Sequence, residues 1–155
     1  MSISEIIQED VVTVDIDDTL LDVADVLHRE QVGSAVVLNT KGEIAGVITD
    51  RDLVVYGHRY ADSLEQTIIN EILSMPVVSV TPGVSIEALT ETMREERIRR
   101  VPVVDDGDLR GIVTLDDVVV YLAGELDNQP LRNLAAVIES ESPPRQPDGL
   151  ETERE

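Results

Sequence analysis

The chain contains two copies of one sequence pattern, and this repeat limits its possible folds more than any other feature. Residues 3–14, ISEIIQEDVVTV, align with residues 69–80, INEILSMPVVSV. Residues 46–56, GVITDRDLVVY, align in the same way with residues 111–121, GIVTLDDVVVY. Because a unit of about 60 residues buries too little surface to be stable alone, the repeat predicts two similar units that share a core.

Each copy has the same expected order of elements. A short helix leads into a valine-rich strand, and an amphipathic helix follows, which Asp18 or Thr19 can cap in the first copy and Ser85 in the second. Two strands then flank a polar turn, and a second helix follows the threonine of each motif. The pattern predicts an α/β (α+β) fold of two β-α-β-β-α repeats. The expected strands are residues 11–14, 35–38 and 44–48 in the first copy, and 77–80, 101–104 and 109–113 in the second.

These patterns also predict the domain boundaries. We place the first repeat at residues 1–60 and the second at residues 67–124, with a linker between them. Residues 125–139 are expected to form a C-terminal helix. Residues 140–155 are rich in proline and charge, so we expect an acidic, disordered tail.

The charge of the chain excludes several classes of partner. Its 32 acidic and 12 basic residues give a net charge of −20, which repels phosphate backbones and anionic membrane surfaces. We therefore expect neither nucleic acid nor membrane as a partner. Eleven arginines against one lysine, with acids along the whole chain, resemble a high-salt cytoplasmic proteome, in which salt screens such repulsion. An acidic protein from an ordinary environment is the alternative.

Residue types that commonly bind metals or perform catalysis are scarce. The chain has no cysteine and two histidines, so disulfides, thiolate sites and a zinc site are not expected. No stretch approaches the roughly 20 apolar residues of a membrane span, and the N-terminus lacks the pattern of a signal peptide. We expect a cytoplasmic protein that is not an enzyme and has no catalytic cofactor.

The Thr-x-x-Asp of each motif has two interpretations. Thr49 with Asp52, and Thr114 with Asp117, match a capping box that starts a helix. The same residues follow a buried strand, and the junction of a strand end with a helix start is where α/β folds bind anionic ligands. A glycine three residues before each threonine lets another group approach the backbone closely.

The duplicated unit, with Gly-(Val/Ile)-(Ile/Val)-Thr-x-x-Asp near the end of each copy, resembles a pair of cystathionine-β-synthase (CBS) domains over about residues 1–124. The resemblance implies a pseudo-twofold disc whose two clefts bind adenosine-containing ligands such as AMP, ADP, ATP, S-adenosylmethionine or NAD. It also implies homodimers. In this family the aspartates would accept hydrogen bonds from ribose hydroxyls, and the threonines would meet phosphate or ribose oxygens.

The resemblance implies that each cleft combines residues of both repeats. Arg51 could reach a ligand in either cleft, and its counterpart Asp116 disfavours a polyphosphate in the second. The arginines of residues 97–100 favour phosphate binding in the first cleft, although salt bridges are an alternative role for them. The first cleft would contain Thr49, Asp52, Val78, Arg99, Arg100 and Pro102, and the second Val12, Gly33, Ser34, Val36, Thr114 and Asp117.

The motifs and the resemblance lead to three hypotheses about function. The leading hypothesis is a non-enzymatic module that binds an adenosyl ligand such as AMP or ATP and signals to a partner protein. The second is a structural or dimerisation module with empty clefts, in which the Thr-x-x-Asp motifs are only helix caps. The third, an enzyme that uses Asp50 and Asp52, lacks a proton-transfer partner or metal cluster.

Overall fold

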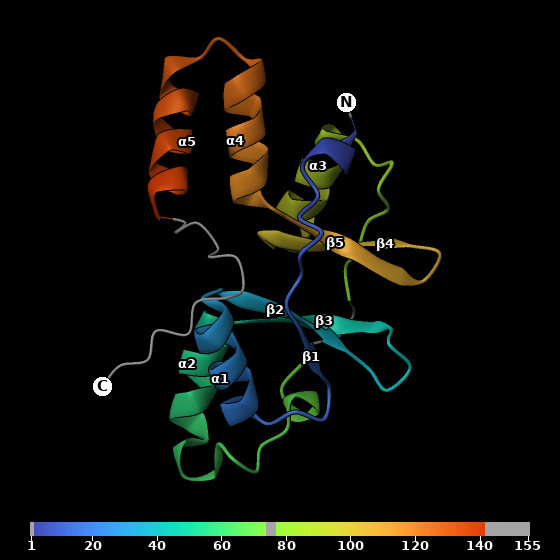
Figure 1. The fold of residues 1–155 in the computed structure, drawn as a ribbon, viewed down its shortest axis with the longest axis vertical. Helices are drawn as coiled ribbons and strands as arrows, with labels where there is room; N and C mark the ends of the chain where they lie inside the picture. The colour runs from blue at the N-terminus through green and yellow to red at the C-terminus, as the bar shows by residue number, and fades with distance from the viewer. Residues whose placement is uncertain (1, 74–76, 142–155) are drawn as a thin grey trace, which may run out of the picture.

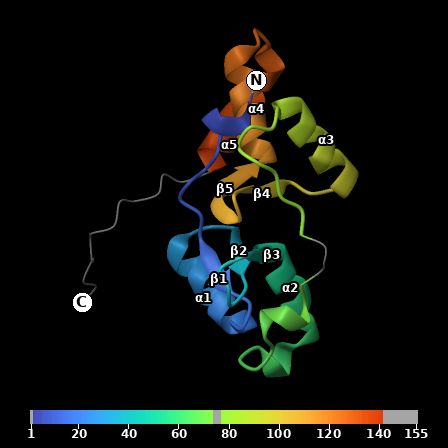
Figure 2. The same ribbon diagram turned by 90° about the vertical axis from the view of Figure 1, so that its right-hand side faces the viewer.

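The computed structural model describes residues 2–73 and 77–141, and they form two α/β lobes, as predicted (Figure 1). The lobes stay distinct when the view is turned by 90°, and the N-terminal segment runs from one lobe to the other (Figure 2). The first half contains a 3-10 helix (Ile3–Glu5), β1 (Thr13–Asp15), α1 (Leu20–Glu30), β2 (Ser34–Leu38), β3 (Ile44–Thr49) and α2 (Asp50–Arg59). The chain continues with two 3-10 helices (Ala61–Ser63 and Ile69–Glu71), α3 (Ile86–Glu96), β4 (Arg100–Asp105), β5 (Asp108–Thr114), α4 (Leu115–Glu125) and α5 (Gln129–Glu141).

The helix starts follow from local hydrogen bonds. Thr19 caps α1, where its hydroxyl accepts a 3.1 Å bond from the backbone N–H of Asp22, and Ser85 caps α3 in the same way through Ala88. A side-chain oxygen at this position satisfies an amide that has no partner within the helix. The capping residues predicted for these helices are therefore confirmed, with Thr19 rather than Asp18 at the start of α1.

The two sheets differ in size. In the first lobe β1 pairs in parallel with β2, and β2 pairs antiparallel with β3. In the second lobe β4 pairs antiparallel with β5, but the predicted strand at residues 77–80 is wrong. Its place is taken by a single parallel bridge between Val80 and Val103.

Two prolines explain the missing strand. The first lobe has a bond from Val36 N–H to the carbonyl of Val12 (2.9 Å) and one from Ile16 N–H to the carbonyl of Leu38 (2.8 Å). The residues aligned with these two donors are Pro102 and Pro82, which have no N–H to donate. In the described part of the second lobe, only Val80 keeps the backbone bonds of the parallel pairing, through its N–H and its carbonyl. The parallel pairing therefore ends on both sides of Val80.

The two repeats exchange their first residues. Ile3 is fully buried in the core of the second lobe, against residues such as Leu89 and Val101. Ile69 is fully buried in the core of the first lobe, which includes Val23. The backbone pairs in the same reciprocal way, from Ile3 N–H to Val84 (3.0 Å) and from Ile69 N–H to Asp18 (2.9 Å). Each lobe therefore needs a segment of the other repeat to complete its core.

The glycine of each motif lies where this exchanged segment crosses the sheet. A methyl group at Gly111 would collide with the carbonyl of Gln8 and the side chain of Ile7. A methyl group at Gly46 would lie 3.2 Å from Leu73, the residue aligned with Ile7. The predicted close approach is therefore found, and the group that approaches is the exchanged segment of the chain.

Helix α5 forms an antiparallel hairpin with α4 on the outer side of the second lobe (Figure 1). It covers residues 129–141, against the predicted 125–139, and the rest of the predicted disordered tail, residues 142–155, lies outside the described residues. Within residues 2–73 and 77–141, no helix has both the length and the apolar character needed to cross a membrane.

Candidate functional site

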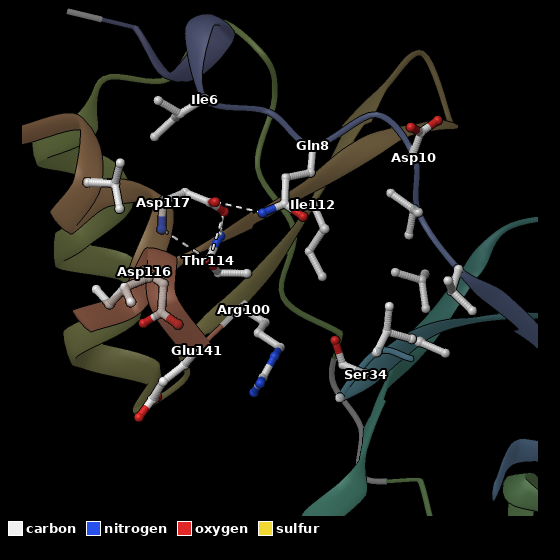
Figure 3. A pocket seen from close by; sticks show the side chains of 18 of the residues that line it. Ile6, Gln8, Asp10, Ser34, Arg100, Ile112, Thr114, Asp116, Asp117 and Glu141 are labelled. Atoms are coloured by element: carbon white, nitrogen blue, oxygen red, sulfur yellow. Dashed lines mark hydrogen bonds between the residues drawn. The ribbon is translucent and has the colours of Figure 1, made fainter. Parts of the chain in front are cut away.

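A cavity of about 770 Å³ lies between the two lobes. Its volume falls within the range of about 300–1,000 Å³ that is usual for small-molecule sites. Figure 3 shows side chains of both repeats pointing into it. The walls come from the N-terminal segment, the start of β2, the end of β5, the first turns of α4 and the end of α5.

The cavity contains the whole residue set expected for the second cleft. Three parts of the chain, distant in sequence, supply these residues, and the exchange of the N-terminal segment brings them together. The expected residues that line the cavity are Val12, Gly33, Ser34, Val36, Thr114 and Asp117.

Arg100 lines this cavity as well, although the resemblance implies the first cleft for it. Its guanidinium points into the space between Ser34 and Glu141 (Figure 3). A methyl group at Gly33 would lie 3.8 Å from Arg100 Nη2 and 3.2 Å from Asp50 Oδ2. Gly33 therefore leaves room for two side chains of opposite charge where the lobes meet.

Thr114 and Asp117 form a complete capping box at the start of α4. Asp117 Oδ2 accepts bonds from the backbone N–H and the hydroxyl of Thr114, both at 2.7 Å. The N–H of Asp117 donates in return to Thr114 Oγ1 at 3.2 Å. Asp117 Oδ1 accepts a 2.6 Å bond from the side-chain amide of Gln8 (Figure 3). The carboxylate is thereby held in one orientation at the wall of the cavity.

Thr49 and Asp52 form the equivalent box at the start of α2, with bonds of 2.9 and 3.2 Å. Asp52 lines a smaller hollow of about 160 Å³ beside Tyr56 and Leu73. Residues 74–76, which follow Leu73, lie outside the described residues. Other residues expected in the first cleft do not line this hollow, namely Thr49, Val78, Arg99, Arg100 and Pro102.

The remaining arginines near the clefts lie on the surface. Arg99 forms a 3.5 Å ion pair with Asp116, and both side chains are at least half exposed. Arg97 ends α3 in the left-handed conformation, and Arg51 is exposed on α2. The salt-bridge role considered for this arginine cluster is therefore present at Arg99.

Several residues of the cavity were not expected from the sequence. Tyr121 lines it, and the tyrosine that ends both repeated motifs was a signal for this role. Gln8 had no such signal. The sequence also placed no residue of α5 in the site, yet Ile138, Glu139 and Glu141 line the cavity. A sequence pattern can predict that a helix forms, but it does not predict where that helix packs on the rest of the fold.

The surroundings of Tyr121 raise the pKa of its phenol above the ordinary value of 10.0. Burial is the main cause, and the negative charges of Glu125 and Glu5 add to it. A hydrogen bond to Glu5 also favours the protonated phenol. Tyr121 therefore keeps its proton at neutral pH and links α4 to the N-terminal 3-10 helix.

The cavity carries more negative than positive charge. Arg100 is the single basic residue among those that line it, and the acidic ones are Asp10, Asp116, Asp117, Glu139 and Glu141. Among residues 2–73 and 77–141, no group of three His, Cys, Asp or Glu side chains is arranged to hold a metal ion.

The comparison with known proteins agrees with this geometry. The model of the CBS domain matches residues 3–59 and again residues 69–124, which together make up most of the chain. The chain belongs to the CBS-domain family. Its two CBS domains form a regulatory module of the type called a CBS pair.

Several similar proteins and solved structures contain CBS domains. The CBS domain-containing protein YhcV of Bacillus subtilis is 31% identical over 136 residues, which are 86% of this chain and 95% of that protein. The crystal structure of a CBS-domain protein from Agrobacterium tumefaciens is 33% identical, with a TM-score of 0.64 over 72% of this chain and 83% of that one. The CBS pair of protein MJ0100, crystallised with 5′-methylthioadenosine and S-adenosylmethionine, shares the fold at 21% identity, with a TM-score of 0.71 over 81% of this chain and 98% of that one.

Proposed function

We propose that this CBS pair is a non-enzymatic sensor that binds an adenosine-containing ligand in the cavity of about 770 Å³ and passes the change to a partner protein. The observation that carries the proposal is the Asp117 carboxylate, which is fixed at the wall of the cavity by its capping bonds. A fixed carboxylate suits a ribose, because both hydroxyls of a cis-diol can donate to it.

The rest of the cavity suits the other parts of such a ligand. Ile6 and Val12 of the first repeat and Val120 of the second offer apolar side chains to an adenine ring. Ser34 and Arg100 add polar groups on the facing side. Apolar side chains together with polar groups that converge on the same space are typical of sites that orient a small molecule.

The location of the cavity supports a signalling role. A ligand there would contact the N-terminal segment, β2 and α4, which belong to different lobes. If it binds one arrangement of the lobes more tightly than another, it shifts the population toward that arrangement. Homodimerisation and a regulated partner protein belong to this proposal. Val54 and Val55 of α2, which are 73% and 55% exposed, offer an apolar surface for such contacts.

Calorimetry with adenosine, AMP, ATP and S-adenosylmethionine at high salt tests the proposal. We expect at least one of them to bind, and Asp117→Asn to weaken that binding by tenfold or more, roughly the effect of a hydrogen bond to a charged group. Asp52→Asn is the matched control, because Asp52 has the same capping role but lines the smaller hollow. Heat from none of the four ligands would contradict the proposal.

One observation favours the alternative, a structural module without a ligand. Both oxygens of Asp117 already accept hydrogen bonds from the chain itself. If the motif served only as a helix cap, Asp117→Asn and Asp52→Asn would both destabilise the protein, and no adenosyl ligand would change its thermal stability.

A further inference from the structure

Helix α5 is not part of either CBS domain but contributes to the candidate site. The family model ends at residue 124, and α5 covers residues 129–141. Its last two turns nevertheless place Ile138, Glu139 and Glu141 in the cavity wall. In Figure 3, Glu141 lies on the same side of the cavity as Asp116, at the start of α4.

The position of α5 is fixed by contacts with the end of α4 and the turn that follows it. Asn128 caps α5, with its side-chain oxygen 3.2 Å from the N–H of Leu131. Arg132 pairs with Asp127 at 3.0 Å, and Ala135 is buried against the hairpin. Because α4 carries Asp117, the α4–α5 hairpin holds the α5 carboxylates at a set place relative to the proposed ribose site.

These carboxylates determine the electrostatic character of the cavity. Without Glu139 and Glu141, three carboxylates and Arg100 would line the cavity, and Arg99 outside the cavity already pairs with one of the three, Asp116. With the two glutamates, five carboxylates line the cavity beside one arginine, so negative charge is in excess. A cleft with charges of one sign focuses their field, so it repels phosphate groups and attracts cations.

We propose that α5 makes this cleft select adenosyl ligands without phosphate groups, and favour those with a positively charged substituent. The inference rests on the proposed adenosyl site. Asp116 follows Thr114 and precedes Asp117 in the chain, and Glu141 lies on the same side of the cavity (Figure 3), so the α5 carboxylates act on a ligand whose ribose is held by Asp117. The chemical class expected is a neutral or sulfonium-bearing adenosyl compound.

The test compares four probes at low and at high salt, namely S-adenosylmethionine, adenosine, AMP and ATP. We expect affinity to decrease in that order, and the differences to shrink in molar salt, where the Debye length is about 3 Å. The double variant Glu139→Gln/Glu141→Gln should bind ATP about five- to tenfold more tightly and S-adenosylmethionine more weakly, with little change for adenosine.

Glu96→Gln is the matched control, because Glu96 is also an exposed acid at the last position of a helix but does not line the cavity. It should leave all four affinities unchanged. Tighter binding of ATP than of adenosine by the natural chain would overturn the inference and leave the adenosyl site intact. An effect of Glu96→Gln half as large as that of the double variant would also overturn it, because Glu96→Gln removes one charge and the double variant two, and net charge alone would then explain the preference. Binding of none of the four probes would contradict the adenosyl site itself.

Discussion

The side-chain amide of Gln8 donates a 2.6 Å hydrogen bond to Asp117, a residue 109 positions later in the chain. The bond joins the N-terminal segment to the first turn of α4 across the wall of the cavity. It also occupies Asp117 Oδ1, the oxygen for which a ribose hydroxyl would compete. Gln8 is therefore placed to oppose ligand binding in the second cleft.

Replacing Gln8 by alanine should increase the affinity for adenosine. The gain should be at most about tenfold, because a net hydrogen bond is worth about 0.5–1.5 kcal/mol. Calorimetry measures it, with Gln66→Ala as a control at an exposed position of the linker. A loss of affinity in Gln8→Ala would instead make Gln8 a direct contact of the ligand.

The exchanged isoleucines should stabilise both lobes together. Ile3→Ala and Ile69→Ala each remove a fully buried side chain, and each should lower the free energy of unfolding by about 2–5 kcal/mol. Urea unfolding measures the loss, and it should occur in one transition for both variants. Val54→Ala, at a position that is 73% exposed, should change stability by less than about 0.5 kcal/mol. Separate transitions for the two lobes would contradict the reciprocal exchange.

Aligned positions in the two parallel pairings should respond differently to proline. Val36→Pro removes the N–H that donates to Val12 and should lower the free energy of unfolding by about 1–3 kcal/mol. Pro102→Val supplies the missing donor opposite Val78, so we expect stability within about 1 kcal/mol of the natural chain. Slow hydrogen exchange at the new amide would show the added bond, and a loss in Pro102→Val as large as that in Val36→Pro would refute the explanation.

Tyr121 should titrate above pH 10 in the folded protein. Because its folded pKa is raised, the folded state binds this proton more tightly than the unfolded state does. The resulting contribution to stability is present below about pH 10 and is lost as the pH rises through the folded pKa. Ultraviolet titration of the natural chain and of Tyr121→Phe measures this pKa. A component above pH 10 that is unchanged in Tyr121→Phe would contradict the assignment.

Much of the fold was predictable because its signals are local. Thr19 and Ser85 cap their helices through an amide three residues away, and such bonds depend on the near sequence alone. The repeat made the other elements easier to predict, because the same strand and turn signals occurred in both copies. The prediction failed at residues 77–80, where the apolar pattern favoured a strand but Pro82 and Pro102 removed the donors of its pairing.

The candidate site was predictable only where it depends on the repeated motif. The sequence placed Thr114 and Asp117 at a helix start, and the resemblance grouped them with residues of the other repeat. The sequence did not place Gln8 in the cavity, because no local signal marks this glutamine, and it did not place α5 there, because α5 lies beyond the family model. It also assigned Arg100 to the first cleft, whereas its side chain points into the cavity of the second.

The sequence by itself determined the two repeated units, their helix caps and the two Thr-x-x-Asp motifs, because these features depend on residues within a few positions of one another. Only the tertiary structure decided that Ile3 and Ile69 exchange lobes, that Arg100 lies at the second cleft, and that α5 adds its carboxylates to the cavity. These features depend on packing between segments far apart in the chain. Burial of apolar surface drives that packing but has no direction of its own, so the final contacts are set by how well the whole surfaces fit.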